Sequence, residues 1–159
     1  MTTGFLWGKF MPLHRGHMHL IESARARVDR LTVLLCSVRS QPIPGEVRYR
    51  WLCQLYPDLD IQHCAEELPQ YPSEHPDYWS LWLPIIRCHC PVIDFVFTSE
   101  TYGDEFARLL GAKHLCVDLN RDRFPVSGTA VRADPARHSE FLPPLVRTYF
   151  SNSNSPLNL

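Results

Sequence analysis

The sequence predicts an α/β domain built on a doubly wound parallel sheet with helices on both faces. Short, almost continuously apolar runs alternate along the chain with longer segments whose apolar residues recur at the helical period. Runs of this kind are typical of strands that are buried on both faces. The 159 residues, of which 45% are hydrophobic, suffice for a single domain with a sizeable core. A Rossmann-like fold is therefore expected.

Composition excludes several classes of protein. The formal net charge of −1 gives no electrostatic basis for binding nucleic acid or a membrane surface. The start of the chain does not resemble a signal peptide, and no run approaches the ~20 apolar residues of a membrane span, so a cytoplasmic protein is expected. The six cysteines do not suggest a disulfide framework. Cys88 and Cys90 flank a histidine but point nearly opposite ways on a helix, so no metal site is expected there.

The first βα unit carries the most informative segment. A strand is expected over residues 5–7, and a helix over 18–28. The apolar positions of this helix, Leu20, Ile21, Ala24 and Val28, lie on one face. The segment GKFMPLHRGH between them is a strand-to-helix turn. Such a turn lies beyond the carboxyl end of a parallel strand, where open α/β sheets bind ligands.

The residue types in this turn suit a phosphate. Gly8 lets the backbone approach a ligand closely, and Gly16 opens the helix without a Cβ in the way. His17 lies in the first helical turn, where free N–H groups attract anions. His14, three residues earlier, can face the same anion. Two imidazoles around one point suit a phosphoryl group whose charge grows as it is transferred.

The next elements are a strand over 31–36, a helix over 46–56 and a short strand over 59–64. Val47, Trp51 and Leu55 form the apolar stripe of the helix. Arg48 and Arg50 lie off that stripe. They either contact phosphate or form a solvated basic face, and the residues alone leave both interpretations open.

A long, proline-rich loop over 65–76 follows, and loops of this length are usually functional or disordered. Asp77 is expected to cap a helix that Pro84 bends or restarts. Trp79 and Trp82 are spaced i, i+3 on this helix and share a face. They either pack in the core or form a stacking platform for a flat, cationic ring.

Two further strands are expected over 94–99 and 114–117, separated by a helix over 102–110 that Gly111 ends. Polar residues follow the carboxyl ends of the strands, as a ligand crevice requires. They are His14, Ser37, Ser99, Glu100 and Asp118.

A second motif, VSGTAVR, spans residues 126–132. Ser127 is a good N-cap, which would offer another helix N-terminus to an anion. Thr129 and Arg132 are i, i+3 neighbours, so a hydroxyl and a guanidinium share one edge. A short helical segment over 134–150 is expected to close the domain, which spans 1–150. Residues 151–159 form a polar tail that is expected to be disordered.

These motifs resemble a known family. GKFMPLHRGH resembles the G-x-F-x-P-x-H-x-G-H signature of the HxGH nucleotidyltransferase superfamily, and VSGTAVR resembles its second signature, I-S-S-T-x-x-R. Val126 and Gly128 depart from that second signature. The GKF start, the W-x-x-W pair, Asp118, Arg121 and Phe124 resemble the nicotinamide mononucleotide (NMN) adenylyltransferase domain of NadR-type proteins. The resemblance covers residues 4–150.

The resemblance implies an adenylyltransferase that condenses ATP with NMN to give NAD and pyrophosphate by direct in-line transfer. His14, His17 and Arg132 would be catalytic, and Mg²⁺ would be carried on the ATP phosphates without a metal site on the protein. The tryptophans would then stack on nicotinamide. The implied binding residues are Gly8, Lys9, Phe10, Gly16, Ser127, Thr129, Trp79, Trp82, Ser99, Glu100, Asp118 and Arg121.

Three alternatives remain at the level of sequence. The acceptor could be another phosphate such as pantetheine phosphate or glycerol phosphate. The chain could be a non-catalytic nucleotide- or NAD-sensing domain, but such a domain would not need both histidines together with Arg132. A metal site of His14, His17 and His19 is disfavoured because His17 and His19 point apart on a helix. The expected partners are ATP and NMN, with no nucleic acid or membrane, and homo-oligomerisation remains open.

Overall fold

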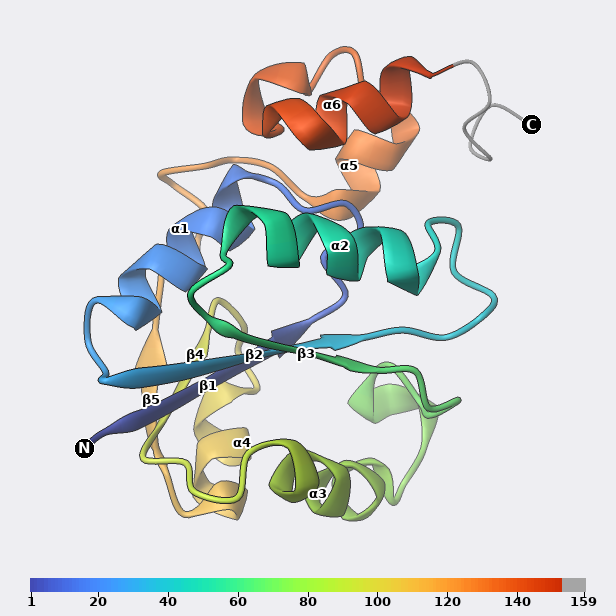
Figure 1. Cartoon of the computed structure of the whole chain (residues 1–159). Coiled ribbons are helices and arrows are strands. Elements are labelled where there is room, and N and C mark those ends of the chain that lie inside the picture. The colour runs from blue at the N-terminus through green and yellow to red at the C-terminus, as the bar shows by residue number, and fades with distance from the viewer. Residues whose placement is uncertain (153–159) are drawn as a thin grey trace.

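Five parallel strands form the centre of the computed structural model, which describes residues 1–152 (Figure 1). The strands are β1 (Thr3–Gly8), β2 (Arg30–Cys36), β3 (Asp60–Cys64), β4 (Phe95–Thr98) and β5 (Lys113–Cys116). Their order in the sheet is β3-β2-β1-β4-β5, and every neighbouring pair is parallel. The chain therefore winds outward from β1 in one direction and then in the other, which confirms the doubly wound topology.

Helices cover both faces of the sheet (Figure 1). They are α1 (Arg15–Arg25), α2 (Gly45–Leu55), α3 (Tyr78–His89), α4 (Gly103–Leu110), α5 (Gly128–Ala133) and α6 (Pro144–Ser151), with short 3₁₀ turns at Pro72–Glu74 and Ser139–Phe141. The helices α1, α2, α5 and α6 lie on one side of the sheet, and α3 and α4 lie on the other. Within residues 1–152, no helix has the length and apolar character needed to cross a membrane.

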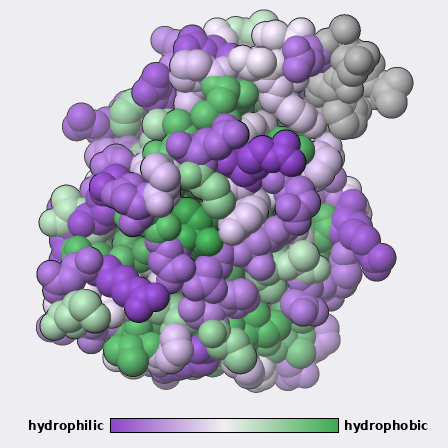
Figure 2. All heavy atoms as spheres, viewed as in Figure 1, coloured by the Kyte–Doolittle hydropathy of each residue, from purple (hydrophilic) through white to green (hydrophobic). Residues whose placement is uncertain are grey.

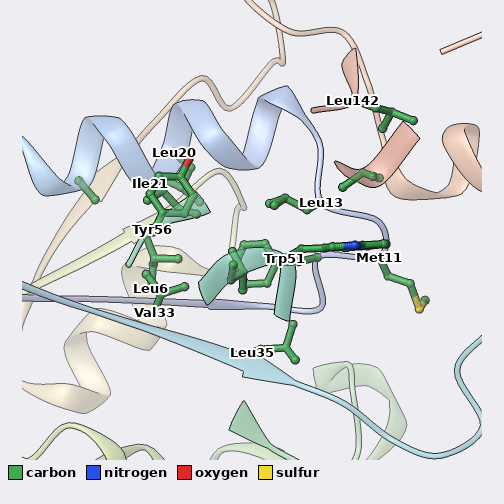
Figure 3. Packing of buried hydrophobic residues seen from close by; sticks show 14 of the residues in the cluster. Leu6, Met11, Leu13, Leu20, Ile21, Val33, Leu35, Trp51, Tyr56 and Leu142 are labelled. Atoms are coloured by element: carbon green, nitrogen blue, oxygen red, sulfur yellow. The ribbon is translucent and has the colours of Figure 1, made fainter. Parts of the chain in front are cut away.

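Each face of the sheet has its own core, because successive side chains of a strand point to opposite faces. On one side, Leu6 and Val33 pack with Ile21 of α1 and Trp51 of α2 (Figure 3). On the other side, Phe5 of β1 packs in a cluster with residues of α3 and α4. The outer surface in the view of Figure 2 is largely hydrophilic, with hydrophobic residues in scattered groups.

The helix boundaries differ in places from those expected. α1 begins at Arg15 and ends at Arg25, so Val28 follows the helix, although it still packs against the core. α3 runs without interruption through Pro84, so the expected restart of the helix does not occur. Proline removes the bond to the carbonyl four residues earlier, that of Ser80, which is exposed and can be hydrated. Asp77 is the N-cap residue of α3, but its side chain makes no capping bond.

The last helix includes Ser151, which was expected to belong to the polar tail. Residues 153–159, the remainder of that expected tail, lie outside the described residues.

Candidate active site

A cavity of about 370 Å³ opens at the carboxyl ends of β1 and β4. β1 is the strand at which the winding direction reverses, and ligands bind at this point in doubly wound sheets. The cavity is lined by the turn after β1, the start of α1, the end of β4, the segment after β5 and the start of α5. Of the catalytic and binding residues implied by the family resemblance, all except Trp79 line it. They are Gly8, Lys9, Phe10, His14, Gly16, His17, Trp82, Ser99, Glu100, Asp118, Arg121, Ser127, Thr129 and Arg132.

The two histidines of the first motif form a reciprocal cap at the start of α1. His14 is the N-cap residue, and its Nδ1 accepts bonds from the backbone N–H groups of Gly16 (3.1 Å) and His17 (3.4 Å). His17 Nδ1 accepts a bond from the backbone N–H of His14 (3.2 Å). The rings are stacked, with centroids 3.7 Å apart and planes at 20°. Because each Nδ1 accepts a hydrogen bond, each neutral ring carries its proton on Nε2.

Both histidines are neutral at neutral pH. Burial, together with the positive charge of Arg121, lowers the pKa of His14 to about 3. Burial also lowers the pKa of His17 well below its ordinary value, assisted by His14 and Arg121. The two rings can therefore offer Nε2–H hydrogen bonds to a ligand, but they do not contribute positive charge.

Positive charge at the cavity comes from Lys9, Arg121 and Arg132. Lys9 Nζ donates to the Tyr71 hydroxyl (2.5 Å) and lies 3.8 Å from the centroid of that ring. Arg121 donates to the Val126 carbonyl (2.9 Å) and lies 3.7 Å from a carboxylate oxygen of Glu100. Three cationic side chains from separate segments thus surround one cavity, which suits a polyanionic ligand.

The second motif packs directly on the first. Arg132 donates to the backbone carbonyl of Met11 and lies 3.5 Å from the Thr129 hydroxyl, so the expected shared edge is confirmed. Ser127 Oγ accepts a bond from the Ala130 N–H (3.1 Å), so Ser127 caps the six-residue helix α5 as expected.

The close approach depends on the absence of a side chain at Gly128. A Cβ at this position would lie 2.6 Å from the carbonyl oxygen of Met11 and 3.2 Å from Arg132 Nη1. Real Cβ atoms essentially never come as close as 2.6 Å to another heavy atom, and the atom they would meet here belongs to the backbone. The missing side chain therefore lets α5 lie against the turn after β1.

The two tryptophans of α3 have different surroundings. Trp82 lines the cavity, is 1% exposed, and its indole Nε1 donates to the Pro69 carbonyl (2.8 Å). Trp79 does not line the cavity, because its ring stacks on Phe106 of α4 (centroids 5.2 Å apart). The expectation of a platform made by both α3 tryptophans is therefore corrected: only Trp82 forms part of the wall.

Trp7, at the end of β1, is the tryptophan of the cavity wall that the sequence interpretation missed. It lines the cavity, stacks on Phe106 (4.9 Å) and meets the edge of Trp82 (5.0 Å, planes at 89°). Its indole Nε1 is buried and has no hydrogen-bond partner among the described residues. Its position directly before Gly8, at the end of the first strand, was the available signal.

Three non-glycine residues with left-handed backbone conformations lie around the cavity. They are Phe10 (φ 49°), Asp118 (φ 50°) and Arg121 (φ 56°). Conformations of this kind cost about 1–3 kcal/mol each and persist where the surrounding structure imposes them. At Asp118 the side chain helps to hold the conformation, because its carboxylate accepts hydrogen bonds from the backbone N–H groups of Asp122 (2.9 Å) and Arg123 (3.2 Å).

Three polar residues that were candidates for phosphate contact or for the crevice lie outside the cavity wall. Arg48 is fully buried and belongs neither to a solvated face nor to the cavity wall. Its guanidinium donates to the Lys9 carbonyl (2.8 Å) and to Gln41 Oε1 (2.7 Å), and burial lowers its pKa to about 10. Arg50, its neighbour on α2, is exposed. Ser37 is buried beside His63 and does not line this cavity.

The long loop over 65–76 supplies further walls that were not assigned individually from sequence. Its residues Gln70, Tyr71 and Pro72 line the cavity together with Tyr78 of α3 and Tyr102 before α4. The length and proline content of the loop did indicate a functional segment, but they did not indicate which side chains turn inward.

Comparisons with known proteins agree with this geometry. The model of the cytidylyltransferase-like family matches residues 5–134. The trifunctional NAD biosynthesis/regulator protein NadR of Escherichia coli (strain K12) is 30% identical over 166 residues, covering 94% of this chain and 40% of that protein. The chain thus spans less than half the length of that relative. The nicotinamide-nucleotide adenylyltransferase of Methanoculleus marisnigri is 26% identical over 158 residues, covering 92% of this chain and 88% of that protein.

The fold agrees as well. A crystal structure of NadR protein in complex with NAD and AMP-PNP superposes with a TM-score of 0.68 at 21% sequence identity. The superposition covers 95% of this chain and 47% of that chain. This similarity confirms the Rossmann-like architecture.

Proposed function

The chain belongs to the cytidylyltransferase-like family, and on that premise we propose that it is a nicotinamide-nucleotide adenylyltransferase, condensing ATP with NMN to give NAD and pyrophosphate. One observation carries the proposal. The stacked histidines of α1 and Arg132 of α5 line one cavity at the switch point of the sheet. The relative from M. marisnigri, whose name states this activity, aligns with most of the chain.

The proposed reaction is a direct displacement at phosphorus. An oxygen of the NMN phosphate forms a bond to the α-phosphorus of ATP, while the bond from that phosphorus to the bridging oxygen of pyrophosphate breaks. No covalent enzyme intermediate is needed. The protein contributes mainly position, which can lower the barrier by about 7–11 kcal/mol, and donors aimed at the charge that develops on the phosphoryl oxygens.

The donors have separate roles. The Nε2–H groups of His14 and His17 would bind phosphoryl oxygens as neutral donors, because burial keeps both rings unprotonated. Arg132 would present two N–H groups to the triphosphate, since its guanidinium is already held at the cavity by the Met11 carbonyl. Lys9 and Arg121 would balance the remaining phosphate charge.

Magnesium would enter with ATP. Among residues 1–152, no group of three or more His, Cys, Asp or Glu side chains is placed to hold a metal ion. Mg²⁺ needs few protein ligands and is commonly bound through substrate phosphates. We therefore assign the ion to the β- and γ-phosphates of ATP.

The acceptor ring would lie against the aromatic wall of Trp7 and Trp82. The positively charged nicotinamide ring suits such a wall, because tryptophan is the best cation–π partner. Residues 71–82 contain no Lys or Arg to meet a carboxylate, and Lys9, which lies against the Tyr71 ring, is assigned here to the phosphates. We therefore expect NMN to be preferred over nicotinate mononucleotide.

Pyrophosphate release tests the proposal. The purified chain is incubated with ATP, Mg²⁺ and one acceptor at a time: NMN, nicotinate mononucleotide, pantetheine phosphate or glycerol phosphate. The proposal requires the fastest release with NMN and the formation of NAD. Faster release with another acceptor would place the chain elsewhere in the superfamily, and NAD binding without any release would identify a sensing domain.

A further inference from the structure

A second cavity, of about 300 Å³, lies beside the carboxyl ends of β2 and β3 at the start of α2. It shares no lining residue with the first cavity. Three of its lining residues, Ser37, His63 and Glu46, carry side chains that are commonly used in nucleophilic catalysis. None of the three has a role in the proposed adenylyl transfer.

These three side chains are connected in series. Ser37 Oγ lies 2.7 Å from His63 Nε2. The other ring nitrogen, His63 Nδ1, lies 3.4 Å from Glu46 Oε1. A hydroxyl on one nitrogen of an imidazole and a carboxylate on the other is the arrangement of nucleophile, base and orienting acid.

The fold brings these residues together from distant parts of the chain. Cys36 of β2 pairs with Cys64 of β3, and the N–H of Ser37 donates to the Cys64 carbonyl (2.9 Å). The pairing of Leu35 with His63 places the Ser37 and His63 side chains on the same face of the sheet, since alternate residues share a face. That face is covered by α2, whose first turn contains Glu46.

Gly45 makes this arrangement possible. A Cβ on Gly45 would lie 2.4 Å from Ser37 Oγ and 2.8 Å from His63 Nε2. Only a glycine therefore allows α2 to begin directly over the serine–histidine pair. The N–H groups of Gly45 and Glu46 have no acceptor within the described part of the chain, and they belong to the first turn of an eleven-residue helix.

The electrostatic surroundings favour a neutral imidazole. Burial lowers the pKa of His63 and Arg48 acts in the same direction, while the Glu46 carboxylate opposes them. The ring is held flat against Tyr49 of α2 (centroids 5.5 Å apart, planes at 24°). A neutral ring with Nδ1–H directed at Glu46 leaves Nε2 free to accept the proton of Ser37.

We propose that Ser37, His63 and Glu46 form a second reactive centre that accepts and hydrolyses small acyl groups. Ser37 Oγ attacks the carbonyl carbon of an ester, and its proton passes to His63 Nε2. The tetrahedral oxyanion is placed at the free N–H groups that begin α2. The carbon–oxygen bond to the alcohol then breaks, and the alcohol leaves with the proton from His63.

The acyl group on Ser37 is then removed by water. His63 Nε2 takes a proton from the attacking water molecule, the bond to Ser37 Oγ breaks, and the serine recovers its proton as the carboxylic acid leaves. No oxidant, metal or cofactor is required. The cavity volume restricts the acyl group to a short chain, and this inference does not depend on the adenylyltransferase proposal.

p-Nitrophenyl acetate is a suitable probe, because acylation releases a coloured phenolate. The full chain should show a burst of one phenolate per molecule, and mass spectrometry of its peptides should find the acetyl group on Ser37. Ser37→Ala should abolish the burst, and His63→Ala should slow it by about 10²–10⁴-fold. Ser80→Ala, which changes an exposed serine of α3, is the matched control and should behave like the unaltered chain.

The alternative is that the Ser37–His63 contact only joins two strand ends. In that case no burst appears, the burst survives in Ser37→Ala, or the acetyl group maps to a lysine, and each of these results overturns the proposal. Glu46→Gln changes an exposed side chain and should preserve the fold, so it decides the matter if Ser37→Ala does not fold. The proposal requires Glu46→Gln to slow acylation at least tenfold while adenylyl transfer is unchanged, and an unaltered rate of acylation overturns it.

Discussion

The buried histidine pair predicts that the protein loses stability as the pH falls below neutral. The pKa of His14 is lowered to about 3, against an ordinary value of 6.5. Below pH 6.5 the unfolded chain therefore binds a proton at His14 that the folded chain does not bind until about pH 3. The free energy of unfolding must then decrease as the pH decreases through this range.

The magnitude follows from the size of the pKa shift. Each pH unit below the unfolded pKa lowers the free energy of unfolding by about 1.4 kcal/mol. Between pH 7 and pH 5, His14 alone should therefore lower it by about 2 kcal/mol. His17, whose pKa is also lowered by burial, adds a loss in the same direction. Two kcal/mol is a large share of the 5–15 kcal/mol typical of a domain, on the order of a factor of 30 in the folding equilibrium.

His14→Asn isolates this contribution. Asparagine is a good N-cap whose side-chain oxygen can accept the same backbone N–H groups, but it does not titrate. Urea unfolding followed by tryptophan fluorescence at pH 5, 6, 7 and 8 measures the free energy for each protein. Between pH 7 and pH 5, the free energy of unfolding of the variant should fall by about 2 kcal/mol less than that of the original chain. Above pH 7, the free energies of the two proteins should change with pH in the same way.

Ser127→Asn is the matched control, because it replaces the cap residue of α5 without altering a titratable group. It should keep the pH dependence of the original chain. If the free energy of unfolding falls equally in His14→Asn and in the original chain between pH 7 and pH 5, the reasoning is refuted, since His14 would then bind its proton equally well in the folded and unfolded states.

Five further substitutions test the site. His17→Ala removes one Nε2–H donor and should lower kcat about 10²–10³-fold with ATP still bound; near-normal turnover would contradict the mechanism. Arg132→Lys keeps the charge but loses the planar fork, so the KM for ATP should rise more than that for NMN, whereas equal rises would indicate a structural role. Trp82→Ala should raise the KM for NMN about two- to thirtyfold and spare ATP, because cation–π contacts contribute about 0.5–2 kcal/mol. Trp79→Ala should lower the melting temperature and leave the ratio of the two KM values unchanged. Gly128→Ser adds a side chain against the Met11 carbonyl and should destabilise the fold by about 1–3 kcal/mol in urea unfolding; an unchanged stability would show that α5 can shift away from the turn after β1.

The sequence by itself determined the architecture and the location of the cavity. Buried parallel strands need continuous apolar runs, and the helices that cover them need apolar residues at a period of 3.6. These patterns are local, so five strands and their crossover helices could be predicted from them. The carboxyl ends of parallel strands lie at one edge of the sheet, and for that reason the sequence alone predicts that His14, Ser99 and Asp118 lie together.

The tertiary structure alone decided how individual side chains are used. The i, i+3 spacing of Trp79 and Trp82 places both on one face of α3. Phe106 of α4 covers Trp79, whereas Trp82 lines the cavity. The sequence pattern does not distinguish Arg48 from Arg50, since both lie off the apolar stripe of α2. Arg48 is nevertheless buried, and its guanidinium donates to the Lys9 carbonyl and to Gln41.

The physical reason is that burial and hydrogen bonding depend on residues far apart in the chain. Arg132 reaches Met11 across 121 positions of sequence, and Ser37 meets His63 across 26. The lowered pKa values of His14 and His17 likewise arise from desolvation and from Arg121, which lies more than a hundred residues away. Periodicity indicates only which face of an element is apolar. The neutral state of the histidines and the second cavity depend on contacts between distant segments, and periodicity therefore does not predict them.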